Sequence, residues 1–153
     1  MPGAVRTQVT AAQTDDVPAL VALLGELFAL ESDFHPDAEK QARGLRLILK
    51  HPDKGRLFVA RADGRVIGMA SALFTVSTAE GGPVVLLEDV IVTRSWRGRG
   101  IGRQLVEHVL CWAKQEGMLR VTLLTDTGNE RARCFYERLG FVASAMTVYR
   151  YFL

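Results

Sequence analysis

The chain has 153 residues, 24% of them charged, and a formal net charge of +2. This length predicts a single domain over residues 1–153, and 48% hydrophobic residues is ordinary for a globular protein. So small a charge gives no support to nucleic-acid binding. No apolar run approaches the roughly 20 residues that span a membrane, and residues 1–10 lack the apolar core of a signal peptide. We therefore expect a cytoplasmic protein without a membrane partner.

The first half of the chain predicts a strand, two helices and a hairpin. Residues 5–11 alternate weakly, as in a strand, and a helix should then begin near residues 14–18 and run to about Leu30. A shorter helix is expected over residues 37–50. Residues 56–61 and 65–76 read as two strands joined by Ala62-Asp63-Gly64, a tight turn of the Asp-Gly type.

The second half continues with a buried strand over residues 84–92 and a helix that ends near Gln115. A strand at 121–125, a helix from about residue 130 to 138–140, and short strands at 141–143 and 146–151 complete the order. We expect one mixed, mostly antiparallel α/β sheet with helices on both faces. Cys111 and Cys134 fall in helical patterns, without metal-ligand spacing, and are predicted to be buried free thiols.

A glycine-rich turn stands between the buried strand and the helix that follows it. Residues 97–102 read Arg-Gly-Arg-Gly-Ile-Gly. Glycines allow the backbone to approach a ligand closely, and the unpaired N–H groups of a first helical turn point at an anion. Four arginines lie within residues 94–103: Arg94, Arg97, Arg99 and Arg103. The pattern predicts a phosphate-binding loop.

Two common phosphate-binding designs do not fit this loop. A P-loop ends in Gly-Lys-Ser/Thr, whereas Gly102 is followed by Arg103 and Gln104. A dinucleotide-binding motif counted from Gly98 places Arg103 where the third glycine belongs. The third design, Arg-x-x-Gly-x-Gly, is matched by Arg97, Gly100 and Gly102.

With that motif the sequence resembles the GNAT superfamily of N-acetyltransferases, which use acetyl-coenzyme A. A second motif, Asn-Glu-Arg-Ala-Arg-Cys-Phe-Tyr-Glu-Arg-Leu-Gly-Phe at residues 129–141, is similar to the family segment in which an Asn precedes a helix carrying a Tyr. The Leu-Glu-Asp at residues 87–89, followed by an apolar triplet, is similar to the spermidine/spermine and related small-amine branch. The resemblance covers nearly the whole chain.

The resemblance implies a set of coenzyme-binding residues. Backbone N–H groups of the loop would hold the pyrophosphate, and Arg97 would contact a phosphate or shape the loop. The strand before the loop would offer its backbone to the pantetheine arm as an added strand would, and Asn129 would bond to that arm or cap its helix. The full set is Val90, Ile91, Val92, Arg97, Gly98, Arg99, Gly100, Ile101, Gly102, Arg103, Asn129 and Tyr136.

The resemblance also implies two catalytic residues. Tyr136 would be the general acid that protonates the departing thiolate, although a Phe-Tyr pair in an amphipathic helix also suits core packing. Glu88 would help to remove a proton from the amine. Because strand alternation sends Glu88 and Asp89 to opposite faces, only one should face a given site unless a bulge re-aims the strand. A salt bridge to an arginine is the structural alternative for Glu88.

The expected acceptor is a small cationic amine, such as a polyamine, an amino acid or an aminoglycoside, and the expected acceptor-binding residues are Glu88, Asp89 and Glu31. Glu31, Asp33 and His35 follow the first helix. The resemblance implies that this connection borders the acceptor pocket, and the alternative is a solvated loop. No metal is expected, since direct transfer in a ternary complex relies on proximity and proton handling.

Several alternatives remain open from the sequence. The chain could acetylate a protein N-terminus or a lysine, or could be a non-catalytic sensor that binds acyl-coenzyme A. A nucleic-acid binder would use the arginine cluster, but that cluster lacks interleaved aromatic residues beyond Trp96. Residues 146–152 are apolar enough to form a homodimer contact.

Overall fold

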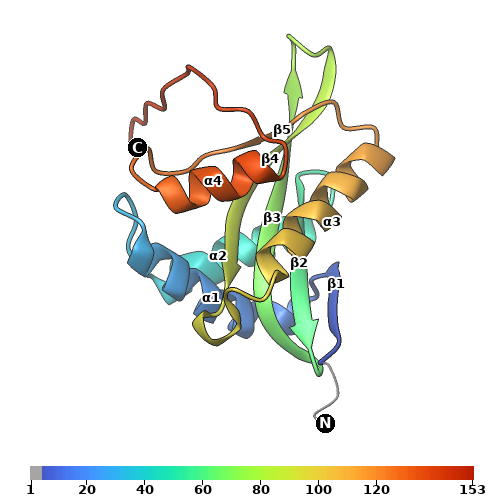
Figure 1. Cartoon of the computed structure of the whole chain (residues 1–153), viewed down its shortest axis with the longest axis vertical. Coiled ribbons are helices and arrows are strands. Elements are labelled where there is room, and N and C mark those ends of the chain that lie inside the picture. The colour runs from blue at the N-terminus through green and yellow to red at the C-terminus, as the bar shows by residue number, and fades with distance from the viewer. Residues whose placement is uncertain (1–4) are drawn as a thin grey trace.

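The computed structural model describes residues 5–153 (Figure 1). The prediction that residues 1–10 form no signal peptide falls partly on residues 1–4, which lie outside the described residues. Among residues 5–153, the structure has no helix with the length and apolar character needed to cross a bilayer.

One five-stranded sheet forms the centre of the described chain. Its strands are β1 (Thr7–Ala11), β2 (Gly55–Ala62), β3 (Arg65–Ser77), β4 (Gly82–Val92) and β5 (Val121–Leu123), and they lie in that order. The first three pairings are antiparallel, and β4 pairs with β5 in parallel. The mixed, mostly antiparallel sheet is therefore confirmed.

The predicted hairpin between β2 and β3 is confirmed, with Asp63 (φ 47°) and Gly64 (φ 78°) both in the left-handed region. That combination is the one a two-residue turn needs to match the twist of its strands, and Asp-Gly tolerates it well.

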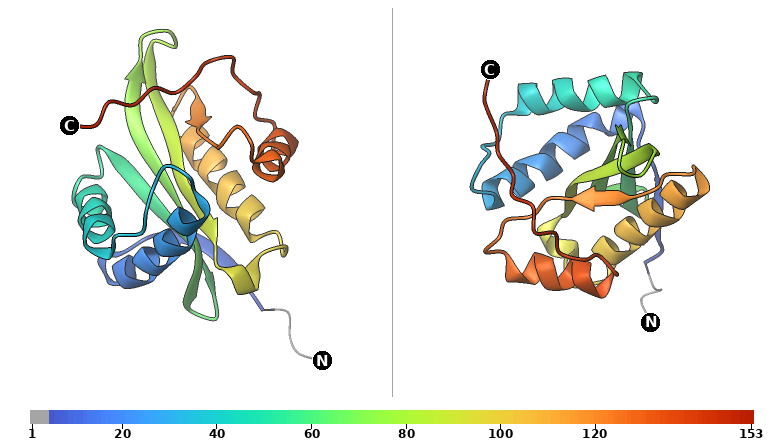
Figure 2. Two further views of the ribbon diagram at one scale, coloured as in Figure 1. Left: turned by 90° about the vertical axis from the view of Figure 1, so that its left-hand side faces the viewer. Right: turned by 90° about the horizontal axis from the view of Figure 1, so that it is seen from above.

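Two helices cover each face of the sheet (Figure 2, right). They are α1 (Val17–Leu30) and α2 (Ala38–Lys50) on one face, and α3 (Ile101–Gln115) and α4 (Glu130–Arg138) on the other. Each strand sends alternate side chains to the two faces, so Leu57, Val59 and Met69 pack with α1 and α2. Phe58, Ala60 and Ala70 pack with α3 instead, and aromatic residues of α4 cover that second core.

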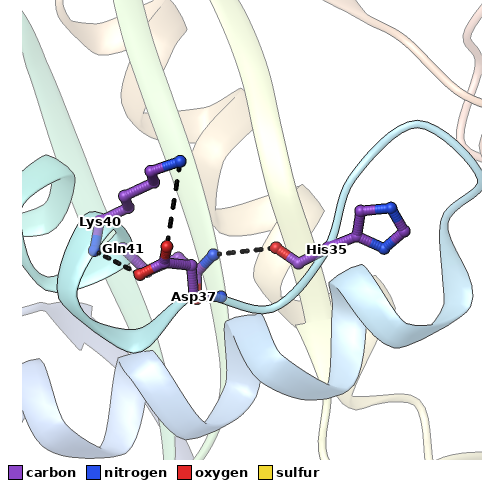
Figure 3. Close-up of polar contacts among 4 residues, drawn as sticks. All are labelled: His35, Asp37, Lys40 and Gln41. Carbon is purple, nitrogen blue, oxygen red and sulfur yellow. Dashed lines mark hydrogen bonds and ion pairs between the residues drawn. The ribbon is translucent and has the colours of Figure 1, made fainter.

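The α1–α2 connection, residues 31–37, ends in a well-formed helix start. Asp37 Oδ1 accepts from the N–H of Lys40 at 3.1 Å, and Gln41 Oε1 accepts from the N–H of Asp37 at 2.9 Å. These reciprocal bonds satisfy two free donors of the first turn. Figure 3 shows the imidazole of His35 pointing away from these three residues.

Two sequence predictions are wrong. Residues 141–153, expected to form two strands, have no strand partner within residues 5–153; they leave α4 and cross toward the α1–α2 connection instead of following the edge of β5 (Figure 2). Cys111 and Cys134 are exposed. Cys111 lies off the buried stripe of α3, which is formed by Ile101, Leu105, Val106, Val109 and Ala113.

Candidate active site

The glycine-rich loop adopts the backbone conformation that its glycines allow. Gly98 (φ 74°) and Gly100 (φ 79°) are both left-handed, and Gly100 is the N-terminal cap residue of α3. It has no side chain to cap the helix, and the first turn carries no acidic residue. The positive end of the α3 dipole therefore faces solvent without a compensating negative group.

The amides of this loop are available to a ligand. Its backbone hydrogen bonds run from Arg97 N to Arg94 O (3.4 Å) and from Gln104 N to Gly100 O (3.1 Å). Within residues 5–153, no such bond outside the regular elements is donated by residues 98–103. These N–H groups therefore retain the capacity to bind an anion.

Arg97 fixes the position of the loop. Its Nε donates to the carbonyl of Val92 at 2.8 Å, and its Nη2 lies 3.8 Å from Glu26 Oε2 on α1. These contacts correspond to the loop-shaping role, one of the two roles that the resemblance implied. Glu26 was not identified from the sequence, where it reads as an ordinary polar position of α1.

Two other arginines of the cluster have partners on neighbouring residues. The Arg99 guanidinium lies 4.9 Å from the ring centroid of Trp96, and Arg103 Nε donates to Glu107 Oε1 at 2.7 Å. The Arg103–Glu107 pair is an exposed i,i+4 contact, which contributes little to stability.

The pairing of β4 with β5 ends before β4 reaches the loop. It joins Val85 to Val121 and continues only to Leu87 and Leu123. Residues 88–92 of β4 still follow β3, with which Glu88, Ile91 and Val92 pair, but among the described residues they have no strand on their other side. This open edge includes Val90, Ile91 and Val92, the residues expected to receive an extended ligand.

A β-bulge interrupts β4 at Asp89. Between the pairs Ser71↔Glu88 and Met69↔Ile91, β4 has two residues where β3 has one. Asp89 adopts φ 52°, a left-handed conformation that is uncommon outside glycine and costs energy. The sequence allowed Glu88 and Asp89 to face one site only if a bulge re-aims the strand, and β4 has such a bulge.

Asp89 is held by a buried hydroxyl. Ser71 Oγ, which is fully buried, donates to Asp89 Oδ2 at 3.2 Å. Burial first, and then the negative charge of Glu88, raise the pKa of Asp89 to about 6, against the Ser71 bond, which lowers it. The sequence signal for Ser71 was a single hydroxyl in the apolar run of β3.

Further carboxylates surround the bulge. The pKa of Glu31 is raised, first by burial and then by the charges of Asp89, Asp126, Glu88 and Asp33. The three predicted acceptor-binding residues, Glu31, Glu88 and Asp89, thus lie within one electrostatic field. Asp126 was missed because the β5–α4 loop has no periodic pattern to place it.

Tyr136 lies half-buried on α4, against the second core. Its ring meets Phe135 and Phe141 edge-on, with centroids at 5.0 and 5.6 Å. Burial raises its pKa to about 12, so the phenol keeps its proton at neutral pH.

The helix of Tyr136 packs against the start of α3. A Cβ placed on Gly102 would lie 3.5 Å from the ring of Phe135, which shows how closely the two helices approach there. At the start of α4, Asn129 Oδ1 accepts from the N–H of Ala132 at 3.0 Å. Asn129 therefore caps the helix, as one of its two expected roles required, and its carboxamide NH₂ can still donate.

Comparison with known proteins identifies the family. The acetyltransferase (GNAT) family matches residues 22–141. The aminoglycoside N(6')-acetyltransferase type 1 of Salmonella typhimurium is 30% identical over 118 residues, covering 75% of this chain and 80% of that protein. The glucosamine 6-phosphate N-acetyltransferase of Trypanosoma brucei brucei is 34% identical over 89 residues, or 58% of each chain.

Solved structures share the fold. The aminoglycoside N-acetyltransferase AAC(6')-Iy, in a crystal structure with coenzyme A, superposes with a TM-score of 0.84 at 23% identity, covering 99% of this chain and 97% of that one. Sequence motifs, fold and relatives agree, and the chain belongs to the GNAT family of acetyltransferases.

Proposed function

We propose that the protein transfers the acetyl group of acetyl-coenzyme A to a primary amine of a small cationic molecule. The observation that carries this proposal is the adjacency of two features. Unbonded amides of residues 98–103 lie at the start of α3, and the open edge of β4 leads from there to the carboxylates at its bulge.

The residues present fit the coenzyme. The amides of residues 98–103 and the α3 dipole would bind its pyrophosphate. The backbone of Val90, Ile91 and Val92, open on one side, would bind the pantetheine arm as a strand edge does. The free NH₂ of Asn129 would donate to the same arm, because its Oδ1 is already used by Ala132.

The proton chemistry is assigned to residues around the bulge and on α4. A protonated amine, with a pKa near 10, must lose a proton before it attacks. We assign this proton to Asp89, whose pKa of about 6 is closer to neutrality than that of an ordinary carboxylate. Glu88, which raises that pKa, would attract the cation.

The amine nitrogen then forms a bond to the thioester carbonyl carbon, and the carbon–sulfur bond breaks. Tyr136, protonated at neutral pH, donates its proton to the departing sulfur, and its oxygen takes up the second proton that leaves the nitrogen, so that the products are an amide and a free thiol.

The acceptor is proposed from charge. A negative field, which concentrates cations, is created by five carboxylates: Glu31, Asp33, Glu88, Asp89 and Asp126. Among the relatives, one is named for aminoglycosides and another for an amino sugar phosphate. A polyamine or an aminoglycoside fits the field of this chain better than an anionic sugar phosphate.

We also propose a homodimer. Residues 146–152 leave large apolar side chains exposed, among them Met146 (91%), Tyr149 (93%) and Phe152 (77%). An exposed run of this kind is typical of an interaction surface. Light scattering after size-exclusion chromatography should give about twice the mass of the chain, and a monomer at all concentrations would contradict the proposal.

The test of the activity is a thiol-release assay with acetyl-coenzyme A and a panel of polyamines, aminoglycosides and amino acids. Mass spectrometry of the acceptor should show an added acetyl group. Tight binding of acetyl-coenzyme A by calorimetry, without thiol release for any amine or peptide, would show that the protein is a sensor and not an enzyme. Release with peptides alone would make the protein a protein acetyltransferase.

A further inference from the structure

A cation of the chain itself sits on the α1–α2 connection, at the rim of the acidic site. The guanidinium of Arg150 donates through Nη1 to Asp33 Oδ2 at 2.7 Å. The same guanidinium lies 5.3 Å from the ring centroid of Phe34. Phe34 in turn contacts Phe28 of α1, with ring centroids 5.7 Å apart. A carboxylate beside a supported aromatic face is a favourable environment for any organic cation.

Arg150 fastens the C-terminal segment, residues 142–153, to the rest of the molecule. Its neighbours Tyr149 and Tyr151 are 93% and 90% exposed. Within residues 5–153, the hydrogen bonds, ion pairs and aromatic contacts that join this segment to other elements are those of Arg150. The segment crosses from α4 to the α1–α2 connection (Figure 2), and Arg150 supplies the polar contact that anchors its far end.

The Arg150–Asp33 contact lies next to the carboxylates that act on Glu31. Asp33 is two residues from Glu31, and its charge acts on Glu31 together with the charges of Glu88, Asp89 and Asp126. The side chains of Arg150 and Asp33 are 37% and 52% exposed. Water and salt screen such a pair, and a competing cation can displace it.

We propose that Asp33 and Phe34 form a cation subsite that Arg150 occupies in the free protein and that a second ammonium group of a polycationic acceptor takes over. Occupation of this subsite releases the C-terminal segment. Monoamines, with a single charge to place at the reacting centre, leave Arg150 bound. This inference rests on the proposed function for the identity of the acceptor, and it adds a preference for acceptors with two or more positive charges.

Release of the segment can be measured without any turnover. The full-length protein is diluted until light scattering shows the monomer, so that the proposed dimer contact of residues 146–152 does not shield Tyr149 and Tyr151. It is then digested briefly with chymotrypsin, and mass spectrometry follows cleavage after these two tyrosines. Spermine should accelerate this cleavage at least fivefold, relative to sodium chloride at equal ionic strength and to butylamine. Arg150→Gln and Asp33→Asn should be cleaved rapidly without spermine and show no further increase. Arg133→Gln, which removes an exposed arginine of α4, should respond like the unaltered protein.

The two variants should affect kinetics in opposite directions. Arg150→Gln removes the competitor and should lower the KM for spermine three- to tenfold, whereas Asp33→Asn removes the subsite and should raise it. The KM for butylamine should stay within twofold in both.

A cleavage rate that spermine does not change overturns the proposal. So does an Arg150→Gln variant whose KM rises for both amines, because the segment would then be a wall of the acceptor site. Spermine-dependent release without acetylation of any amine would refute the proposed function while supporting the subsite. Acetylation without release would do the reverse.

Discussion

Ser71 and Asp89 lie on neighbouring strands, and the buried hydroxyl of Ser71 donates to the carboxylate of Asp89 at 3.2 Å. This bond is the one contribution that lowers the pKa of a carboxyl otherwise raised by burial and by Glu88. Removing it should therefore raise that pKa further.

Ser71→Ala should move the acid limb of the pH–rate profile to higher pH. The proton acceptor must be ionised, so activity rises as pH increases through the pKa of Asp89, about 6 in the unaltered protein. The measurement is kcat/KM for an amine between pH 5 and 9. Ser77→Ala, at the far end of β3, is the control. A limb that stays in place would assign the proton to another group, Glu88 first.

Asp89→Asn should stabilise the fold while it lowers activity. Because the folded-state pKa of Asp89 lies above the ordinary 3.8, its charge destabilises the protein above pH 6. The neutral amide should gain about 1–3 kcal/mol of unfolding free energy at pH 8, and asparagine tolerates the left-handed backbone. The gain should vanish as pH falls through 6 toward 4. Urea unfolding at pH 8 and pH 4 tests this, and an equal gain at both would contradict it.

Tyr136→Phe should lower kcat by about 10²-fold and leave the KM for acetyl-coenzyme A within about twofold. The aromatic contacts with Phe135 and Phe141 are preserved, so the loss would be that of the hydroxyl. Tyr149→Phe, at a 93% exposed position, is the matched control for steady-state kinetics. Unchanged turnover would remove Tyr136 from the chemistry.

Gly100→Ala should weaken coenzyme binding through the backbone. No atom lies within 4 Å of the added Cβ, but the left-handed φ of 79° remains and costs an alanine about 1–2 kcal/mol. The loop should relax, and the Kd for coenzyme A by calorimetry should rise about tenfold. Gly44→Ala, within α2 and also free of contacts, should leave that Kd unchanged and stabilise the fold by up to about 1 kcal/mol.

Asp16→Asn should destabilise the protein by about 2–3 kcal/mol. Arg61 donates to both carboxylate oxygens of Asp16, at 2.9 and 2.6 Å, which ties the start of α1 to β2. These bonds lower the pKa of Asp16, so their contribution is present above pH 4 and is lost as pH falls below it. Thermal unfolding at pH 7 should show a Tm about 5–10 °C lower. Asp15→Asn, at an exposed neighbouring position, should show almost no change.

The elements that the sequence predicted well are those with their own local signals. The Asp63–Gly64 turn, the Asp37 start of α2 and the glycine at the start of α3 each satisfy a backbone requirement that is readable from a few residues. The apolar periodicity of α1 and α3 likewise predicted which side of each helix is buried against the sheet.

The C-terminal strands were mispredicted because an apolar pattern favours a strand conformation but does not determine which strand it pairs with. Residues 141–153 have the composition of strands, but among the described residues they pair with no strand and leave the outer edge of β5 free. The position of Asp126, the link between Arg97 and Glu26, and the contact of Arg150 with Asp33 are likewise long-range relationships. No spacing along the chain encodes them, because they arise only when loops from different elements meet.

The pairing between β4 and β5 stops at Leu87 and Leu123, and the two strands separate from there on. Beyond that point β4 has no strand on its outer side among the described residues, and an extended ligand with amide groups of its own can pair with that edge. Such a ligand would bridge β4 and β5 where they separate. Binding the coenzyme first would therefore make the surface against which the second substrate docks more rigid.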